Sequence, residues 1–415
     1  MGIMEGESLP NEKSAYAVLR NGDFILFLIA RFIASLGQQM LTVAIGWDLY
    51  ERTKSPLALG LVGLTQVIPM FVFILPAGHL ADVHSRKRII EIATFATAAA
   101  SVGLFFIHRF DADVKWMYAC LFLSGSARMF LWPASSSFLP ALVSREQFPR
   151  AVAWATGSFH LSCVAGPALG GWLIAWNGGA GIVYQLNAVA AFLCVGLIFF
   201  VRKQPAPHSV PDAFTLRRLF SGFAFVYDNK IVLGTITLDL FAVLLGGATA
   251  LLPVYAKDIL HTGPSGLGAL QAALPLGSLA CAMVMAHRRP LERAGRTLLF
   301  AVAVFGVATI GFGFSREIGF SFLMLVVCGA ADNVSVVIRH TLVQLVTPDE
   351  KRGRVSAVNS LFIGTSNELG GFESGLVANF FGPVAAVVSG GVGTLLIVGL
   401  VAWAWPQIRQ FKKLV

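Results

Sequence analysis

The sequence predicts an all-α integral membrane protein with twelve transmembrane helices in two six-helix pseudo-repeats. Three observations lead to this fold class. The chain of 415 residues is 56% hydrophobic and 13% charged, too little charge to cover a soluble protein of this length. Apolar runs of about 20 residues, the length of a helix that crosses a bilayer, follow one another almost from end to end. The basic residues gather in the short intervals between these runs, which is the pattern that orients membrane helices.

The twelve predicted spans form two groups of six. They cover residues 24–50, 57–80, 89–107, 116–139, 151–175, 182–201, 231–256, 265–286, 297–314, 318–346, 355–380 and 384–405. We expect residues 1–22 to form a cytoplasmic N-terminal tail and residues 407–415 a cytoplasmic C-terminal tail. The N-terminal half should cover residues 23–202, the linker 203–230 and the C-terminal half 231–406. Within the linker, residues 216–223 have apolar positions at helical spacing, so we expect an amphipathic helix on the membrane surface.

The distribution of Lys and Arg predicts the orientation. With the N-terminus inside, most bases fall on the cytoplasmic side, and the opposite side receives only Arg52, Lys54, Arg109, Lys115, Lys257 and Arg316. This asymmetry predicts a multi-pass protein of the bacterial inner membrane with both termini cytoplasmic. The net charge of +9 therefore reflects orientation and is no sign of nucleic-acid binding.

A weak internal repeat relates the two groups of spans at an offset of about 203 residues. The stretch that begins at Ala141, Ala-Leu-Val-Ser-Arg-Glu, resembles the stretch that begins at Gln344, Gln-Leu-Val-Thr-Pro-Asp. At the same offset, His84 falls opposite His287, at the start of a second basic loop. Two halves related in this way are typical of secondary transporters that hold their substrate between the halves, near the middle of the membrane.

Several function classes lack their sequence signals. No Gly-rich phosphate loop with Lys-Ser/Thr is present, which argues against an ATP-driven pump. No nucleophile–base set and no His/Cys cluster with metal-ligand spacing appears, so we expect no enzyme activity, no metal and no cofactor. The five cysteines all lie in apolar runs, and we expect no disulfide.

The loop between the second and third spans carries the first family resemblance. It reads Gly78-His-Leu-Ala-Asp82-Val-His84-Ser-Arg86-Lys87-Arg88. This pattern resembles the loop signature of the major facilitator superfamily, with His84 and Ser85 where the family often has a base and a glycine. The resemblance implies the major facilitator fold and a cytoplasmic loop gate at Gly78, Asp82, Arg86 and Arg88. The alternative is a plain basic loop that only orients the helices.

The fifth span contains Gly166-Pro167-Ala-Leu-Gly170-Gly171. This stretch resembles the fifth-span signature of major facilitator antiporters, which are mainly exporters, and the resemblance implies export. The alternative is close packing of helices, which small residues permit.

The whole chain resembles the branch of the superfamily that contains the bacterial enterobactin exporter and macrolide-efflux-type drug:proton antiporters. The segments that carry this resemblance are Arg31-Phe-Ile-Ala-Ser-Leu-Gly37, Ser55-Pro-Leu-Ala-Leu-Gly-Leu61, Leu345-Val-Thr-Pro-Asp-Glu-Lys-Arg-Gly-Arg-Val355 and Asn367-Glu-Leu-Gly-Gly-Phe-Glu373-Ser-Gly375. The resemblance implies a transporter and leaves its substrate open.

Ionisable side chains within spans are costly and mark a transport path or a partner charge. The acids are Asp239, Asp332, Glu368 and Glu373, the bases are Arg31, Arg128 and Arg339, and Trp132 is a candidate cavity aromatic. Asp48 is expected to be exposed at the outer interface.

Each of these acids has two possible roles. One is a structural ion pair: Arg31 or Arg128 with Asp239 or Asp332, or Asp332 with Arg339, which lies two turns along the same helix face. The other is a proton carrier, since a dry cavity disfavours the charged form of a carboxyl group. Asp239 is the first candidate carrier and Asp332 the second. Glu368 and Glu373 lie among small polar residues that are typical of a cavity wall.

Together these features predict a secondary active transporter: a proton-coupled exporter of a drug-like amphipathic compound or a siderophore, working by alternating access. The partners expected are a small-molecule substrate, protons and the lipid bilayer, with no nucleic acid, and the protein is expected to be a monomer. The alternatives are an importer or a lysophospholipid flippase of the same fold, or a membrane receptor or scaffold that transports nothing.

Overall fold

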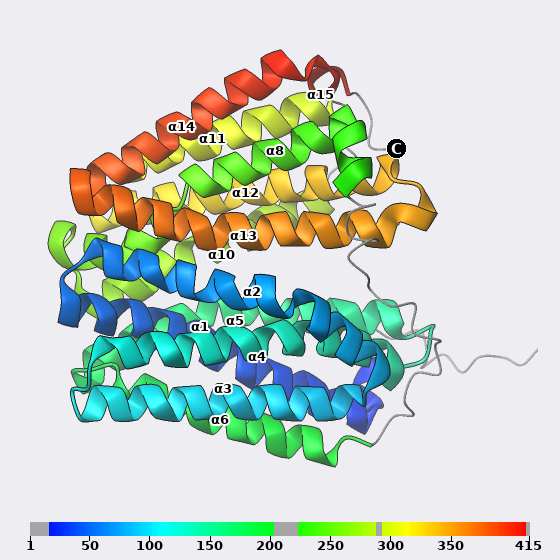
Figure 1. Cartoon of the computed structure of the whole chain (residues 1–415), viewed down its shortest axis with the longest axis vertical. Helices are drawn as coiled ribbons and strands as arrows, with labels where there is room; N and C mark the ends of the chain where they lie inside the picture. Colours follow the sequence, from blue (N-terminus) through cyan, green and yellow to red (C-terminus); the bar gives the residue numbers. More distant parts are fainter. Residues whose placement is uncertain (1–15, 203–222, 288–292, 412–415) are drawn as a thin grey trace, which may run out of the picture.

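The computed structural model describes residues 16–202, 223–287 and 293–411, a part of the chain that is nearly all helical (Figure 1). The first fifteen residues of the predicted N-terminal tail, the predicted linker from 203 to 222 with most of its amphipathic helix, and residues 412–415 of the C-terminal tail lie outside this part. The side chain of Asp82 also lies outside it. The boundaries predicted for the domains therefore stay predictions.

The first half of the chain forms six long helices after a short 3-10 turn. The turn is η1 (Ala17–Arg20), and the helices are α1 (Gly22–Thr53), α2 (Pro56–Val83), α3 (Arg86–Arg109), α4 (Val114–Leu142), α5 (Phe148–Asn177) and α6 (Gly181–Phe200). Polar caps begin several of them: the Asn21 side chain accepts hydrogen bonds from the amides of Asp23 and Phe24, and Ser55 accepts one from Ala58.

The second half repeats this pattern with one interruption. Its elements are α8 (Lys230–Leu245), η2 (Ala248–Leu251), α9 (Leu252–Val254), the π-helical turn η3 (Tyr255–Ile259), α10 (Gly263–Ala286), α11 (Ala294–Phe314), α12 (Ile318–Val346), α13 (Asp349–Phe381), α14 (Pro383–Ala404) and α15 (Pro406–Gln410). The predicted seventh span, 231–256, falls within the candidate membrane span Lys230–Ile259, but its α-helix stops at Leu245 and the span continues in short helical turns. At Gly247 a Cβ atom would lie 2.3 Å from the carbonyl oxygen of Gly370, so the break brings α8 and α13 into close contact.

Within the described residues, ten helical segments are long and apolar enough to cross a membrane. The two predicted spans outside this set are α4 and α13, with 29 and 33 residues. Neither contains a stretch as apolar as those of the ten, and α4 carries Arg128 while α13 carries Glu368. Their polarity fits their position, because both helices line a cavity.

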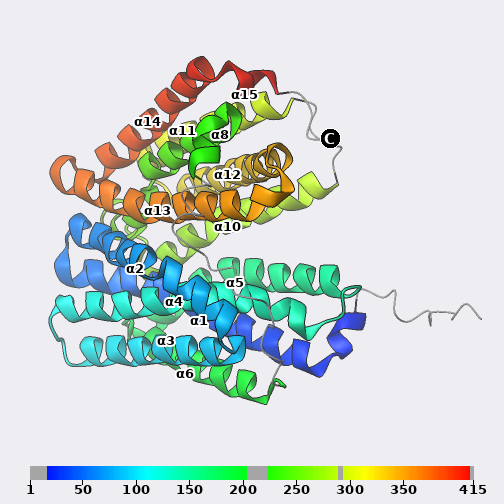
Figure 2. The same cartoon turned by 45° about the vertical axis from the view of Figure 1, so that its right-hand side comes forward.

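The helices form two bundles, α1–α6 and α8–α15, which lie against each other in Figures 1 and 2. The main contacts between the bundles are α2 with α13 and α5 with α10. In each pair, the second long helix of one half meets the fifth of the other, as a parallel two-fold repeat requires. We call the membrane face where α1 begins, near Gly22, the tail face, and the face where α1 ends, near Thr53, the far face.

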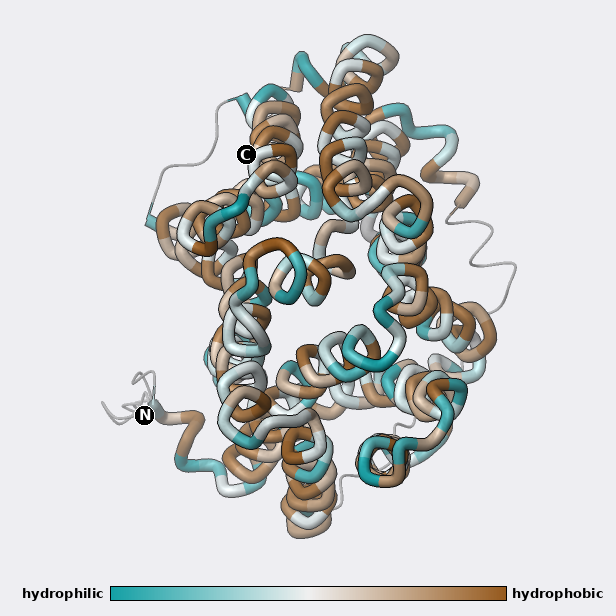
Figure 3. Tube along the Cα trace, turned by 90° about the vertical axis from the view of Figure 1, so that its left-hand side faces the viewer, coloured by the Kyte–Doolittle hydropathy of each residue, from teal (hydrophilic) through white to brown (hydrophobic). Residues whose placement is uncertain are grey.

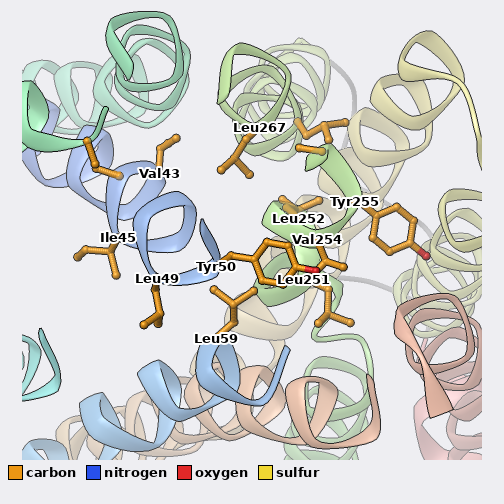
Figure 4. Close-up of a cluster of buried hydrophobic side chains, with 14 of the residues drawn as sticks. Val43, Ile45, Leu49, Tyr50, Leu59, Leu251, Leu252, Val254, Tyr255 and Leu267 are labelled. Atoms are coloured by element: carbon orange, nitrogen blue, oxygen red, sulfur yellow. The ribbon is translucent and has the colours of Figure 1, made fainter. Parts of the chain in front are cut away.

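Buried apolar side chains join the two halves at the far face. One cluster contains Val43, Ile45, Leu49 and Leu59 from the first half together with Leu251, Leu252, Val254 and Leu267 from the second (Figure 4). We call this cluster the far-face seal. The other apolar clusters among the described residues each belong to a single half. The halves are therefore joined by apolar packing toward the far face.

The outside of the two bundles is strongly apolar. Large side chains such as Ile92, Phe200, Leu396 and Trp403 have 68–80% of their surface exposed. Figure 3, which looks along the helices, shows apolar residues over most of the helical turns and polar residues gathered near the connections. A surface of this kind is stable against lipid tails, which confirms the prediction of an integral membrane protein.

Candidate functional site

A central cavity of about 460 Å³ lies between the two halves. The first half contributes α1, α2, α3, α4 and α5, and the second half contributes η2, α9, α10 and α13. Its polar side chains are Gln38, Gln39, Thr42, Gln66, Ser124, Arg128, Thr249, Gln271, Asn367 and Glu368. Between them lie apolar side chains such as Leu121 and Leu274. This mixture suits a compound with both apolar and polar groups.

An ion pair crosses this cavity from one half to the other. Arg128 Nη2 on α4 lies 3.0 Å from Glu368 Oε1 on α13. Both side chains retain partial exposure, 45% for Arg128 and 23% for Glu368, so water and small solutes can reach the pair. The expected pairing of Arg128 with Asp239 or Asp332 is wrong, because Glu368 occupies that place.

Asp239 and Arg339 form the second intramembrane ion pair. They lie on α8 and α12, only 7% and 3% exposed, and contact each other within the second half. Their neighbours in the chain, Leu238 and Ile338, belong to a buried apolar cluster of the second half, and neither Asp239 nor Arg339 lines the central cavity. The expected pairing of Asp332 with Arg339 is therefore wrong. Asp332 and Arg339, seven residues apart, do share a face of α12, but the Arg339 guanidinium contacts Asp239 on α8 instead.

The other two candidate acids lie away from the central cavity. Asp332 is half-buried on α12 and has no ion pair or hydrogen bond among the described residues. Glu373 is half-buried on α13 and accepts a hydrogen bond of 3.4 Å from the Ser374 hydroxyl. Their predicted roles as proton carriers stay predictions.

A second cavity of about 330 Å³ lies within the first half and shares part of the wall of the central one. We call it the N-half cavity. Arg31 lines it, as do Arg128, Trp132 and Phe159. The Arg31 guanidinium lies 5.9 Å from the centre of the Phe27 ring, and no carboxylate pairs with it among the described residues. The structure thus places Trp132 in the wall of the N-half cavity.

The motif of the fifth span lies at a junction of three helices. A Cβ atom at Gly166 would lie 2.5 Å from the Cβ atom of Gln39, and one at Gly170 would lie 3.0 Å from the Cα atom of Met40, both on α1. At Gly171 it would lie 2.8 Å from the Cα atom of Gly268 on α10. The small residues therefore let α1, α5 and α10 approach closely, including across the two halves.

The predicted loop gate lies where α2 meets α3. Arg86 donates a hydrogen bond of 2.9 Å to the carbonyl oxygen of Ser137 at the end of α4. Lys87 donates to the carbonyl oxygens of Phe199 and Val201 at the end of α6. Arg88 is exposed, and a Cβ atom at Gly78 would meet no neighbour within 4 Å. These bonds hold the loop against its own half, and its gating role stays a prediction.

Asp48 is not exposed, contrary to the prediction. It is 4% exposed and lies 3.0 Å from both Tyr184 Oη and His108 Nδ1, while Arg52 Nε lies 3.1 Å away. These groups join α1, α3 and α6 at the far face. The spacing of four residues between Asp48 and Arg52 is a signal that sequence reasoning missed. His108 and Tyr184 carried no such signal, since they are distant in the chain.

Charged side chains also hold the two halves together above the far-face seal. Lys257 on η3 contacts Glu51 on α1, and its Nζ lies 5.6 Å from the centre of the Trp47 ring. Next to it, the Tyr50 hydroxyl donates a hydrogen bond to Asp258. Sequence reasoning placed Lys257 only as an outer base and missed its partners in the other half.

Removing these charges should loosen the closure at the far face. The Lys257→Gln/Asp258→Asn double variant loses both polar links, so the open form should become more populated. We expect a water-soluble maleimide to label a Leu251→Cys reporter, in a background without the native cysteines, about tenfold faster than in the parent. Lys115→Gln at an exposed helix start serves as control. Equal labelling rates would contradict a gating role for these residues.

Two helical bundles with a polar cavity between them, closed at one membrane face, define a secondary transporter with the major facilitator fold. Residues 13–414 match the family model described as "Transmembrane secretion effector". The chain therefore belongs to this family of major facilitator transporters and is a multi-pass membrane protein.

Relatives and solved structures agree with this membership. The chain is 26% identical over 391 residues to the enterobactin exporter EntS of Escherichia coli O1:K1 / APEC, covering 94% of this chain and 93% of that protein. The exporter of the same name from Shigella boydii serotype 18 matches equally. A bacterial homologue of the human lysosomal transporter Spinster, solved in an inward-facing and unoccupied conformation, superimposes with a TM-score of 0.75 at 14% identity, over 97% and 99% of the two chains. The nucleoside transporter NupG gives 0.70 at 15% identity, over 94% and 100%.

Proposed function

We propose that the protein exports a medium-sized amphipathic compound, drug-like or a siderophore, in exchange for protons. The observation that carries this proposal is the Arg128–Glu368 ion pair, which spans the two halves inside the central cavity. Glu368 is the only one of the four candidate acids found in the wall of that cavity as described. It is therefore placed where a proton and a substrate can both reach it.

Alternating access follows from the way the halves meet. The far-face seal and the polar links of Lys257 and Asp258 close one face, so exit to that side requires the halves to rock apart there. We propose that the tail face is cytoplasmic, because Arg20, Arg86, Lys87, Arg88, Arg145 and Arg150 lie near it. In this proposal, the substrate enters the central cavity from the cytoplasm while the far face is closed.

Several observations support the proposed direction of transport and the proposed location of the protein. The relatives are named as enterobactin exporters, and the fifth-span motif resembles that of antiporters. We place the protein in the bacterial inner membrane as a monomer with both termini cytoplasmic, and we assign it no enzymatic step. An importer, a lipid flippase and a receptor have less support, because the relatives are named as exporters.

Inverted membrane vesicles that contain the protein test this proposal. An inside-acid proton gradient is set up, and dyes, macrolides and catecholate siderophores are added one at a time. We expect at least one compound to drain the gradient in these vesicles and to leave it intact in vesicles without the protein. If a labelled compound accumulates while the gradient stays intact, proton coupling is wrong; if no compound from a broad panel moves, the export proposal itself is contradicted.

A further inference from the structure

The N-half cavity carries more positive charge than its neighbours can neutralise. Two guanidinium groups line it, those of Arg31 and Arg128, and no Asp or Glu side chain appears in its described wall. Arg128 has its partner in Glu368, on the central-cavity side. Arg31 therefore holds the uncompensated charge of this cavity.

An unpaired guanidinium within a membrane span is costly to keep. The Phe27 ring at 5.9 Å attracts the cation through its π face, but an aromatic ring supplies no net negative charge. Structural arginines of this chain show the contrast: Arg339 is buried against Asp239, and Arg52 binds Asp48. Arg31 lacks such a partner, so a negatively charged ligand is the group that would complete its surroundings.

The rest of the wall indicates which kind of anion fits. Trp132 is 68% exposed and Phe159 is 37% exposed, so both offer ring surface, and planar guanidinium groups stack on flat aromatic ligands. The hydroxyl of Thr94, a residue only 3% exposed, lines the cavity and has no hydrogen-bond partner of normal geometry. Ser35 and Gln38 add further polar groups. The volume of about 330 Å³ falls in the range of roughly 300–1,000 Å³ that small-molecule sites occupy.

We propose that the N-half cavity is a binding site for an aromatic organic anion, with Arg31 as the residue that holds its negative group. This inference rests on the proposed export function and narrows its substrate to compounds that carry a ring and an acidic group. The ring would lie near Trp132 and Phe159, and the acidic group between Arg31 and the Thr94 hydroxyl.

Two xanthene dyes of similar framework and opposite charge test this inference. Fluorescein is an aromatic anion and rhodamine 6G an aromatic cation, and both report binding to the purified full chain through fluorescence anisotropy. We expect fluorescein to bind, and we expect a large excess of rhodamine 6G not to displace it. Arg31→Gln should weaken fluorescein binding about ten- to a hundredfold, as the loss of a charged hydrogen bond does.

Two further variants separate ligand binding from structure. Arg31→Lys keeps the charge and should recover part of the affinity, and Arg109→Gln at an exposed helix end should change nothing. Arg31→Gln should unfold at a temperature no lower than the parent does, because no protein partner loses its pair and an unpaired charge is removed from the span. Unchanged fluorescein affinity in Arg31→Gln, or equal binding of rhodamine 6G, would overturn the inference.

Failure of the proposed anion site can be distinguished from failure of the proposed export function. If vesicles export a neutral or cationic compound while fluorescein does not bind, the anion site is wrong and the export function stands. If fluorescein binding depends on Arg31 but no compound is transported, the site stands and the export function is wrong.

Discussion

Asp239→Asn is expected to destabilise the protein by about 3–5 kcal/mol, because it leaves the Arg339 guanidinium buried without a counter-charge. Both side chains are nearly inaccessible to solvent, and the residues next to them in the chain, Leu238 and Ile338, belong to a buried apolar cluster. The measurement is unfolding in detergent, followed by a spectroscopic signal from the purified protein. Arg339→Met should cost a similar amount, since it leaves the carboxylate of Asp239 unpaired.

The double variant Asp239→Leu/Arg339→Met separates a pairing role from a proton-carrying role. Removing both charges removes the unpaired group, so much of the lost stability should return. Asp228→Asn, at an exposed position before α8, serves as the control. A fully stable Asp239→Asn protein that has lost proton coupling would contradict the structural pair. It would support the proton-carrier role that the sequence first indicated for Asp239.

Glu368→Gln is expected to uncouple transport from the proton gradient. Glutamine keeps the shape of the side chain but neither gains nor releases a proton, and it cannot form an ion pair with Arg128. Substrate-dependent proton flux should fall to the level of vesicles that lack the protein, because Glu368 is the one acidic side chain in the described wall of the central cavity. Stability should change by less than about 1 kcal/mol, because the pair is partly exposed.

The comparison that decides this prediction uses two readouts in the same vesicles. Exchange of labelled for unlabelled substrate should persist in Glu368→Gln, whereas the proton flux should not. Glu317→Gln, an exposed change at the start of α12, should leave both intact. Normal proton flux in Glu368→Gln would rule out Glu368 as the carrier and leave Asp332 as the next residue to test.

The sequence by itself determined the protein class and most of the helices. Hydropathy and the placement of bases are local properties, and each span must satisfy its own backbone within the bilayer, so each span can be recognised alone. The predicted tenth span, 318–346, coincides with α12, and the repeat between the halves reappears in the matched contacts of α2 with α13 and α5 with α10. The motifs indicated the superfamily, because they lie at helix crossings and loops that the fold itself requires.

Only the tertiary structure decided which charges meet. Arg128 and Glu368 are 240 positions apart in the chain, yet they form an ion pair. Arg339 pairs with Asp239 on another helix and not with Asp332 on its own helix. A span shows which of its residues share a face, but it does not show which neighbour that face meets or how it is rotated. The break after Leu245 likewise depends on how closely α13 approaches Gly247, which is a contact between distant segments. The packing of helices on one another determines which ion pairs form in a bundle, and the sequence of a single span does not determine that packing.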